Sequence, residues 1–346
     1  MKHKHFQIGI SILFAVFFAF SLSACASSKA ASAEEYFSLG MAYFELGQAA
    51  SDSNTRVKYF LESEKWFERA SSIDKTQNAS EYNLGRLAFE TGRFQDAARQ
   101  FEKILKKDPD NILALRAAAY TRIKTGDIEL AEKHYNKLLT LVPESADSGY
   151  NYALVLYTME KYEQAEQVLL KNQFALLDNS NSLLLYARTQ NKLDRIEAVD
   201  TYARWLTDNK NAKVRAEYAE ILENREFYAK ALEEYREALK EITDANKEIK
   251  KADVIFCIAR VILIADSENK EGISELEKAV KEGFADLEKL KNLADDKRLS
   301  EENRSVINRI INDIKEKTKE KEPAAPAVSK RSSEDSPAEE SEPESE

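Results

Sequence analysis

Two periods are superimposed in the hydrophobic pattern of the chain. Small and large apolar residues recur three or four positions apart, which places them on one face of an α-helix. A longer period of 34 residues then relates five pairs of positions: Gly92 and Gly126, Ala97 and Ala131, Phe101 and Tyr135, Ile104 and Leu138, and Pro109 and Pro143. The two periods together predict helix pairs that repeat along the chain.

A ladder of alternating small and large residues extends the long period toward the carboxy terminus. A small residue lets two helices approach closely, and a large residue four positions later fills the gap on the same face. The steps of the ladder are Ala97 with Phe101, Ala131 with Tyr135, Ala165 with Leu169, Ala198 with Tyr202, and Ala231 with Tyr235. We expect these residues to form the interfaces between helices.

Composition supports a helical fold and excludes two kinds of partner. The 346 residues include only 9 Gly and 6 Pro, too few for the turns of a strand-rich fold. No two glycines lie two residues apart, so a glycine loop that cradles a nucleotide is excluded. The formal net charge of −10 argues against a nucleic-acid partner.

The segment Leu84-Gly85, Ala97, Phe101, Pro109 resembles the tetratricopeptide repeat, in which a helix-turn-helix unit recurs about every 34 residues. The resemblance implies an all-α, right-handed superhelical solenoid. It also implies a concave surface, lined by the first helix of each repeat, that binds extended or helical peptides.

The chain divides by this pattern into repeats and flanking segments. The second helix of the first repeat is predicted to start near Thr55, because that copy is 11 residues longer than the period. A capping helix is predicted from Ser300 to Lys317, as a solenoid needs one to cover its last apolar face. The predicted segments are a lipoprotein signal peptide at 1–24, a lipid-anchor linker at 25–32, repeats at 33–77, 78–111, 112–145, 146–178, 179–211 and 212–245, a degenerate repeat at 246–283, a carboxy-terminal segment with the capping helix at 284–317, and a disordered acidic tail at 318–346.

The amino terminus predicts export and lipid attachment. Lys2 and Lys4 precede an apolar run from Ile8 to Leu22, as in a signal peptide. The following Leu22-Ser23-Ala24-Cys25 resembles the lipobox of bacterial lipoproteins, which implies acylation of Cys25. A plain signal peptide and an uncleaved transmembrane anchor are the alternatives. We therefore expect a protein of the bacterial cell envelope, anchored by lipid to the outer or inner membrane, with its solenoid in the periplasm or at the surface.

The residues that carry catalytic chemistry are scarce. After the signal peptide the chain holds one histidine, His134, which is predicted to lie on the outer part of a second helix. Cys257 lies in an apolar run and is predicted to be a core residue. We therefore expect no enzyme activity, no metal site and no cofactor.

The candidate binding residues follow from spacing on the first helices. Positions three before, one after and four after the small residue share one helical face, which the resemblance assigns to the concave surface. In the sixth copy these positions hold Glu220 and Glu223, so we expect an acidic end that repels acids. The candidate groove residues are Phe37, Met41, Phe44, Tyr82, Arg86, Phe89, Arg116, Tyr120, Tyr150, Tyr157 and Arg188.

Two functions fit these observations. The first is a lipid-anchored scaffold or adaptor that binds an envelope protein or peptide in the concave groove. The alternative is a periplasmic small-ligand-binding accessory lipoprotein of a transporter, which a closed apolar cavity would favour. The oligomeric state and the identity of the partner are left open.

Overall fold

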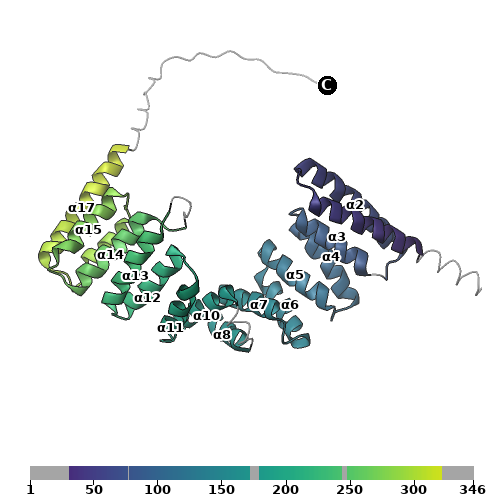
Figure 1. Cartoon of the computed structure of the whole chain (residues 1–346), viewed down its shortest axis with the longest axis horizontal. Helices are drawn as coiled ribbons and strands as arrows, with labels where there is room; N and C mark the ends of the chain where they lie inside the picture. The colour runs from purple at the N-terminus through teal and green to yellow at the C-terminus, as the bar shows by residue number, and fades with distance from the viewer. Residues whose placement is uncertain (1–30, 77, 172–178, 244–247, 322–346) are drawn as a thin grey trace, which may run out of the picture. The chain divides into compact units, whose positions relative to one another are not determined.

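The computed structural model describes residues 31–76, 78–171, 179–243 and 248–321, and these residues form helices and short connections (Figure 1). The predicted all-α fold is therefore confirmed. The chain divides into two compact units, residues 1–208 and 209–346. The predicted signal peptide, Cys25 and the acidic tail from residue 322 lie outside the described residues.

Unit 1 consists of helices that pack against their neighbours in chain order. Its first described helix spans residues 31–49. The helices that follow are α2 (Ser53–Ile73), α3 (Asn78–Glu90), α4 (Phe94–Lys107), α5 (Ile112–Thr125), α6 (Ile128–Leu141), α7 (Ala146–Thr158), α8 (Tyr162–Lys171), α10 (Ser180–Lys192) and α11 (Ala198–Asp208).

Unit 2 continues the pattern of paired helices and ends in a cap. Its helices are α12 (Ala212–Asn224), α13 (Tyr228–Glu241), α14 (Lys251–Ala265), α15 (Lys270–Lys281), α16 (Leu287–Ala294) and α17 (Glu301–Lys321). The apolar face of α17, with Ile307, Ile311 and Ile314, is buried in one cluster with Leu276 of α15 and Leu290 of α16. The predicted capping helix is thus present and covers the last repeat.

The alanine ladder forms the interfaces between paired helices, as predicted. All five ladder alanines are 0% exposed, and the large residues beside them are at most 2% exposed. Gly85 takes the corresponding place on α3, where an added Cβ would lie 2.5 Å from the ring of Phe101. Burying a large apolar side chain contributes about 1.5–3 kcal/mol, so the repeated ladder stabilises both units along their length.

The turns inside the helix pairs use the left-handed backbone conformation. Gly126, with φ of 79°, ends α5 and allows the chain to enter α6. Later turns lack glycine, and Glu160, Asp194 and Glu226 adopt the same conformation with φ between 54° and 63°. These turns keep the repeat geometry although their sequence departs from the pattern.

The first helix pair has a longer second helix than its successors. It begins at Ser53, where the carboxylate of Asp52 accepts a hydrogen bond from the backbone N–H of Thr55 at 2.8 Å.

No helix within the described ranges is both long and apolar enough to cross a bilayer.

Candidate functional site

A cluster of aromatic and arginine side chains lies on α3 and α5 of unit 1. Phe89 of α3 and Tyr120 of α5 meet with their ring centres 5.5 Å apart. With Arg86 they border a hollow of about 130 Å³, which has Phe101 and Ala117 among its other lining residues. Tyr120 is 40% exposed. We call Arg86, Phe89 and Tyr120 the α3–α5 cluster.

Arg86 is held by neutral groups. Its guanidinium lies 4.7 Å from the ring centre of Phe44 and donates a hydrogen bond to the side-chain oxygen of Asn83 at 3.0 Å. Within the described part of the chain neither Arg86 nor the exposed Arg116 forms an ion pair. Both positive charges therefore stay available for an acidic group of a partner, although Glu90 also lines the hollow.

Tyr82 borders the cluster on α3 and packs against the core. Its ring lies 5.6 Å from that of Phe101, and its side chain is partly buried. It packs against Phe101, which lines the hollow, so its ring is only partly accessible.

The candidate residues of the first helix lie deeper than expected. Phe44 is 1% exposed and packs against Phe60, so the prediction that it lines an open groove is wrong. The helix of residues 31–49 packs against α2, where Phe44 meets Phe60, and Arg86 of α3 lies over the ring of Phe44. Phe37 and Met41 are partly buried in the same cluster.

The remaining candidates of unit 1 do not line the α3–α5 hollow. Tyr150 and Tyr157 of α7 are partly buried against the cluster that contains Leu185. Tyr157 also meets the ring of Tyr162 edge-on at 5.3 Å. Arg188 lies partly buried on α10. The structure therefore gathers Arg86, Phe89 and Tyr120 closely, and leaves these three residues at other places in the repeat array.

The expected acidic face of unit 2 is neutralised at its centre. Glu223 is 8% exposed and receives two hydrogen bonds of 2.7 Å from the guanidinium of Arg260, with a third from the hydroxyl of Tyr235 at 3.1 Å. Arg260 also lies 5.7 Å from the ring centre of Phe256. The expectation that Glu223 repels acids is therefore wrong, because its charge is paired within the fold.

Cys257 lies beside this buried pair, on α14. It is partly buried against the core of unit 2, and burial raises the pKa of its thiol above the usual value. A raised pKa disfavours the reactive thiolate, consistent with the predicted packing role.

His134 is part of a polar cluster between α4 and α6. It is 8% exposed, and its Nε2 lies 2.9 Å from the carboxylate of Glu102, so the predicted outer position is wrong. Arg122 of α5 approaches the same carboxylate at 3.4 Å. The hydrogen bond from His134 lowers the pKa of Glu102 more than burial raises it, and Arg122 lowers it further. We call Glu102, Arg122 and His134 the polar filler.

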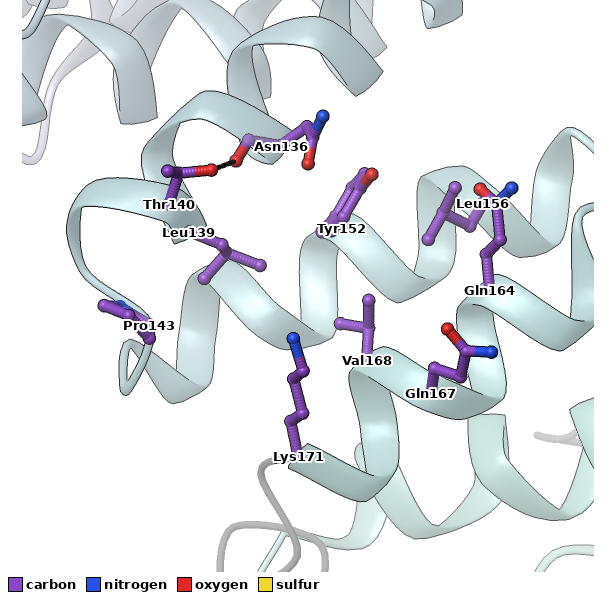
Figure 2. Close-up of a pocket in the computed structure, with 10 residues that line it drawn as sticks. All are labelled: Asn136, Leu139, Thr140, Pro143, Tyr152, Leu156, Gln164, Gln167, Val168 and Lys171. Atoms are coloured by element: carbon purple, nitrogen blue, oxygen red, sulfur yellow. Dashed lines mark hydrogen bonds between the residues drawn. The ribbon is translucent and has the colours of Figure 1, made fainter.

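A larger hollow of about 480 Å³ lies between α6, α7 and α8 (Figure 2). Tyr152 and Leu156 of α7 lie between the residues of α6 and those of α8. The other residues that line it are Asn136, Leu139, Thr140, Pro143, Gln164, Gln167, Val168 and Lys171. The sequence predictions missed this site, although a comparison of non-ladder positions between repeats would have exposed its unusual residues.

Unit 2 has a hollow of its own, of about 620 Å³, beside the capping helix. Val280 of α15 and Ile310 and Ile314 of α17 line it together with Phe284. Among the residues that the structure describes, no group of three potential metal-ligating side chains lies close enough together to hold a metal ion.

Comparison with known families finds repeats in the middle of the chain. Residues 82–146 match a family model described as tetratricopeptide repeat. Residues 124–204 match a model described as anaphase-promoting complex, cyclosome, subunit 3. The two matches overlap and together cover the helices from α3 to α11.

Individual relatives are distant. The chain is 24% identical over 130 residues to the protein CTR9 homolog of Arabidopsis thaliana, and 22% identical over 179 residues to tetratricopeptide repeat protein 8 of Caenorhabditis elegans. These matches cover 37% and 44% of this chain, and 12% and 35% of the two relatives. A crystal structure of a tetratricopeptide repeat protein from Parabacteroides merdae aligns with 76% of this chain and 97% of its own, with 19% identity and a TM-score of 0.50. That likeness shows the fold.

Proposed function

Because the chain is a tetratricopeptide-repeat protein by its fold and by its sequence over residues 82–146, we propose that it is a lipid-anchored scaffold of the bacterial cell envelope. In this proposal the α3–α5 cluster binds a segment of a protein partner. The observation that carries it is the exposed Tyr120 beside Phe89 and a guanidinium without an acidic partner. Tyrosine and arginine are the residues that most often dominate binding energy at interfaces.

The chemistry of the cluster selects the partner segment. Phe89 and Tyr120 offer an apolar surface to one or two large side chains, and the 130 Å³ hollow admits part of one. Arg86 and Arg116 favour carboxylates, which a guanidinium binds with two parallel hydrogen bonds. The preferred segment thus carries acidic residues beside apolar ones.

Capture of partners from membranes tests the site. Phe89→Ala and Tyr120→Ala should each weaken binding by about 2 kcal/mol, or some thirtyfold, with helicity retained. Melting should stay close to wild type for Tyr120→Ala, because Tyr120 is exposed, and fall for Phe89→Ala, because Phe89 packs against the core. Phe227→Ala, an exposed aromatic residue of unit 2, is the matched control and should leave capture unchanged. Recovery of the same partners in the same amounts by all four proteins would remove the α3–α5 cluster from the proposal.

Anchoring is a separate part of the proposal and rests on the sequence Leu22-Ser23-Ala24-Cys25. More than one acyl chain gives stable attachment to a bilayer, since each buried methylene contributes about 0.8 kcal/mol. Wild type should incorporate a metabolic fatty-acid label and Cys25→Ala should not. Equal labelling of the two proteins would exclude lipid attachment at Cys25 without affecting the binding site.

The hollow between α6, α7 and α8 lacks the signature expected for the transporter-accessory alternative. That signature is a closed apolar cavity. The hollow of about 480 Å³ instead has amide and ammonium side chains among its lining residues, including Gln164 and Lys171.

A further inference from the structure

In unit 1, the groove between the second helices of neighbouring repeats is filled by side chains at one place and open at the next. In the groove between α4 and α6, the polar filler of Glu102, Arg122 and His134 occupies the space above α5. Three helices contribute one side chain each, and their ion pairs close the groove.

One repeat later, the same three positions carry small or neutral residues. A shift of 34 residues places Asn136 at the position of Glu102, Leu156 at that of Arg122, and Val168 at that of His134. These side chains do not bridge the groove between α6 and α8, and all three line the hollow of about 480 Å³ (Figure 2). The hollow therefore results from specific replacements within an otherwise regular array.

In the next repeat, Gln190 stands at the position of Leu156 and is bonded within its own helix pair. There the hydroxyl of Thr201 on α11 donates a hydrogen bond of 2.7 Å to the side-chain oxygen of Gln190 on α10. Side-chain contacts thus close the groove between α4 and α6, whereas the groove between α6 and α8 is open.

The lining of the α6–α8 hollow combines an apolar floor with donors and one cation. Leu139 and Val168 form a partly exposed apolar surface beside the ring of Tyr152. Gln167 and Lys171 of α8 provide amide and ammonium donors at the edge, and none of the described residues that line the hollow is acidic. Lys171 forms no ion pair within the described ranges of the chain.

We propose that the α6–α8 hollow is a second binding site, which takes a small amphiphilic carboxylate. The apolar body of the ligand packs on Leu139, Val168 and Tyr152, and its carboxylate receives hydrogen bonds from Lys171 and Gln167. A volume of about 480 Å³ falls within the range of small-molecule sites. The ligand is either the carboxy-terminal residue of a peptide or a free organic acid, since both offer this chemistry.

The second site is independent of the α3–α5 cluster. It is built by side chains of α6, α7 and α8, none of which borders that cluster. On α7, Tyr152 and Leu154 are two residues apart and point in directions that differ by about 160°. The face of α7 that lines the hollow is thus opposite the face that holds Leu154 and the candidate residue Tyr150.

Calorimetry on the full chain in lipid nanodiscs tests the proposal, with empty nanodiscs as the reference. The probes are the peptide acetyl-Ala-Leu with a free carboxylate, the same peptide as its amide, hexanoate, and hexanamide. At least one carboxylate should bind, and its amide should bind at least about tenfold more weakly, because hydrogen bonds to a charged group are stronger than neutral ones. Binding by the peptide alone would identify a peptide terminus as the ligand, and binding by hexanoate would identify an organic acid.

Two variants locate the binding. Lys171→Gln, at an exposed position, should weaken the carboxylate about tenfold, and Lys133→Gln, an exposed lysine of α6 outside the lining, should not. The double variant Asn136→Glu, Val168→His places the polar-filler residues of α4 and α6 in the hollow, leaves the fully buried Leu156 in place, and should abolish binding with helicity retained. Failure of both carboxylates to bind wild type, equal affinity for acid and amide, or unchanged affinity in Lys171→Gln would each overturn the proposal.

Discussion

Each unit holds an arginine over a phenylalanine ring, but the two arginines differ in their hydrogen-bond partners. In unit 1 the guanidinium of Arg86 lies over the ring of Phe44, with the neutral side chain of Asn83 as its hydrogen-bond partner. In unit 2 the guanidinium of Arg260 lies over the ring of Phe256 and binds the carboxylate of Glu223 twice. The presence of one acidic residue, Glu223, therefore makes the difference: the guanidinium of Arg260 is fixed in the fold, and that of Arg86 is available for binding.

Both units otherwise obey the same packing rules. Their ladder alanines are fully buried and their large ladder residues fill the interfaces. The difference between the units is thus one of surface chemistry on the first helices. Four predictions test this comparison, and they follow in order of expected effect.

Removing the cation of unit 2 should have the largest effect. Arg260→Leu leaves Glu223 buried without its ion partner, which costs about 3–5 kcal/mol of folding free energy. Urea denaturation, with hydrogen exchange in α12 to α15 as the local probe, measures the loss. The double variant Arg260→Leu, Glu223→Leu should recover most of it. A single variant within 1 kcal/mol of wild type would mean that the pair contributes little.

The corresponding change in unit 1 should act on binding and spare the fold. Arg86→Leu removes a cation that no acid neutralises, so unfolding should change little while affinity for the captured partner falls by about 2 kcal/mol. Titration of the partner against wild type and variant gives the affinities, and urea denaturation gives the stability. A large loss of stability with unchanged affinity would show that Arg86 is structural, as Arg260 is.

The shared ladder should respond alike in both units. Ala131→Leu in unit 1 and Ala231→Leu in unit 2 each add a branched side chain at a position with no exposed surface. Overpacking of this kind costs about 1–3 kcal/mol. Thermal melting of both variants measures it, with Ala229→Leu, at an exposed position of α13, as the control. Two ladder variants as stable as the control would refute the ladder as the packing element.

Replacing Glu102 in the polar filler of unit 1 should give the smallest effect, a change in how stability depends on pH. The pKa of Glu102 is lowered from 4.5 in the fold, mainly by the hydrogen bond with His134. A lowered pKa means that Glu102 stabilises the folded state above about pH 4.5 and loses this contribution as the pH falls through its folded pKa. The urea midpoint should therefore drop more steeply below pH 4.5 in wild type than in Glu102→Gln. Parallel profiles would contradict the assignment.

The sequence predicted most of the fold because packing in a repeat array is periodic. Ala97 and Ala131 face their partner helices at every turn of the pattern, so one spacing rule locates the interfaces of both units. The capping helix was equally predictable, because Ile307, Ile311 and Ile314 have helical spacing and form an apolar face that has to pack against the last repeat. Such rules act within one helix pair and require no knowledge of distant partners.

The candidate site was less predictable because burial depends on which helices meet. Phe44 has the same place in its repeat as Phe89, yet only Phe44 is covered by the neighbouring helices. Glu223 and Arg260 are 37 residues apart, and the spacing of either residue alone does not reveal the pair. The α6–α8 hollow arises from residues that are too small or neutral to bridge a groove, a signal that hydrophobic periodicity does not contain.

Site-specific photo-crosslinking in cells tests the central claim most directly, that unit 1 binds the partner at the α3–α5 cluster. A photoreactive phenylalanine analogue placed at Tyr120, or at Glu220 of α12 as the equivalent face of unit 2, reports contact at each position. Lys133, on the outer side of α6, serves as the background. We predict a crosslinked partner from position 120, and only background from positions 220 and 133. A crosslink from position 220 with none from position 120 would contradict the account.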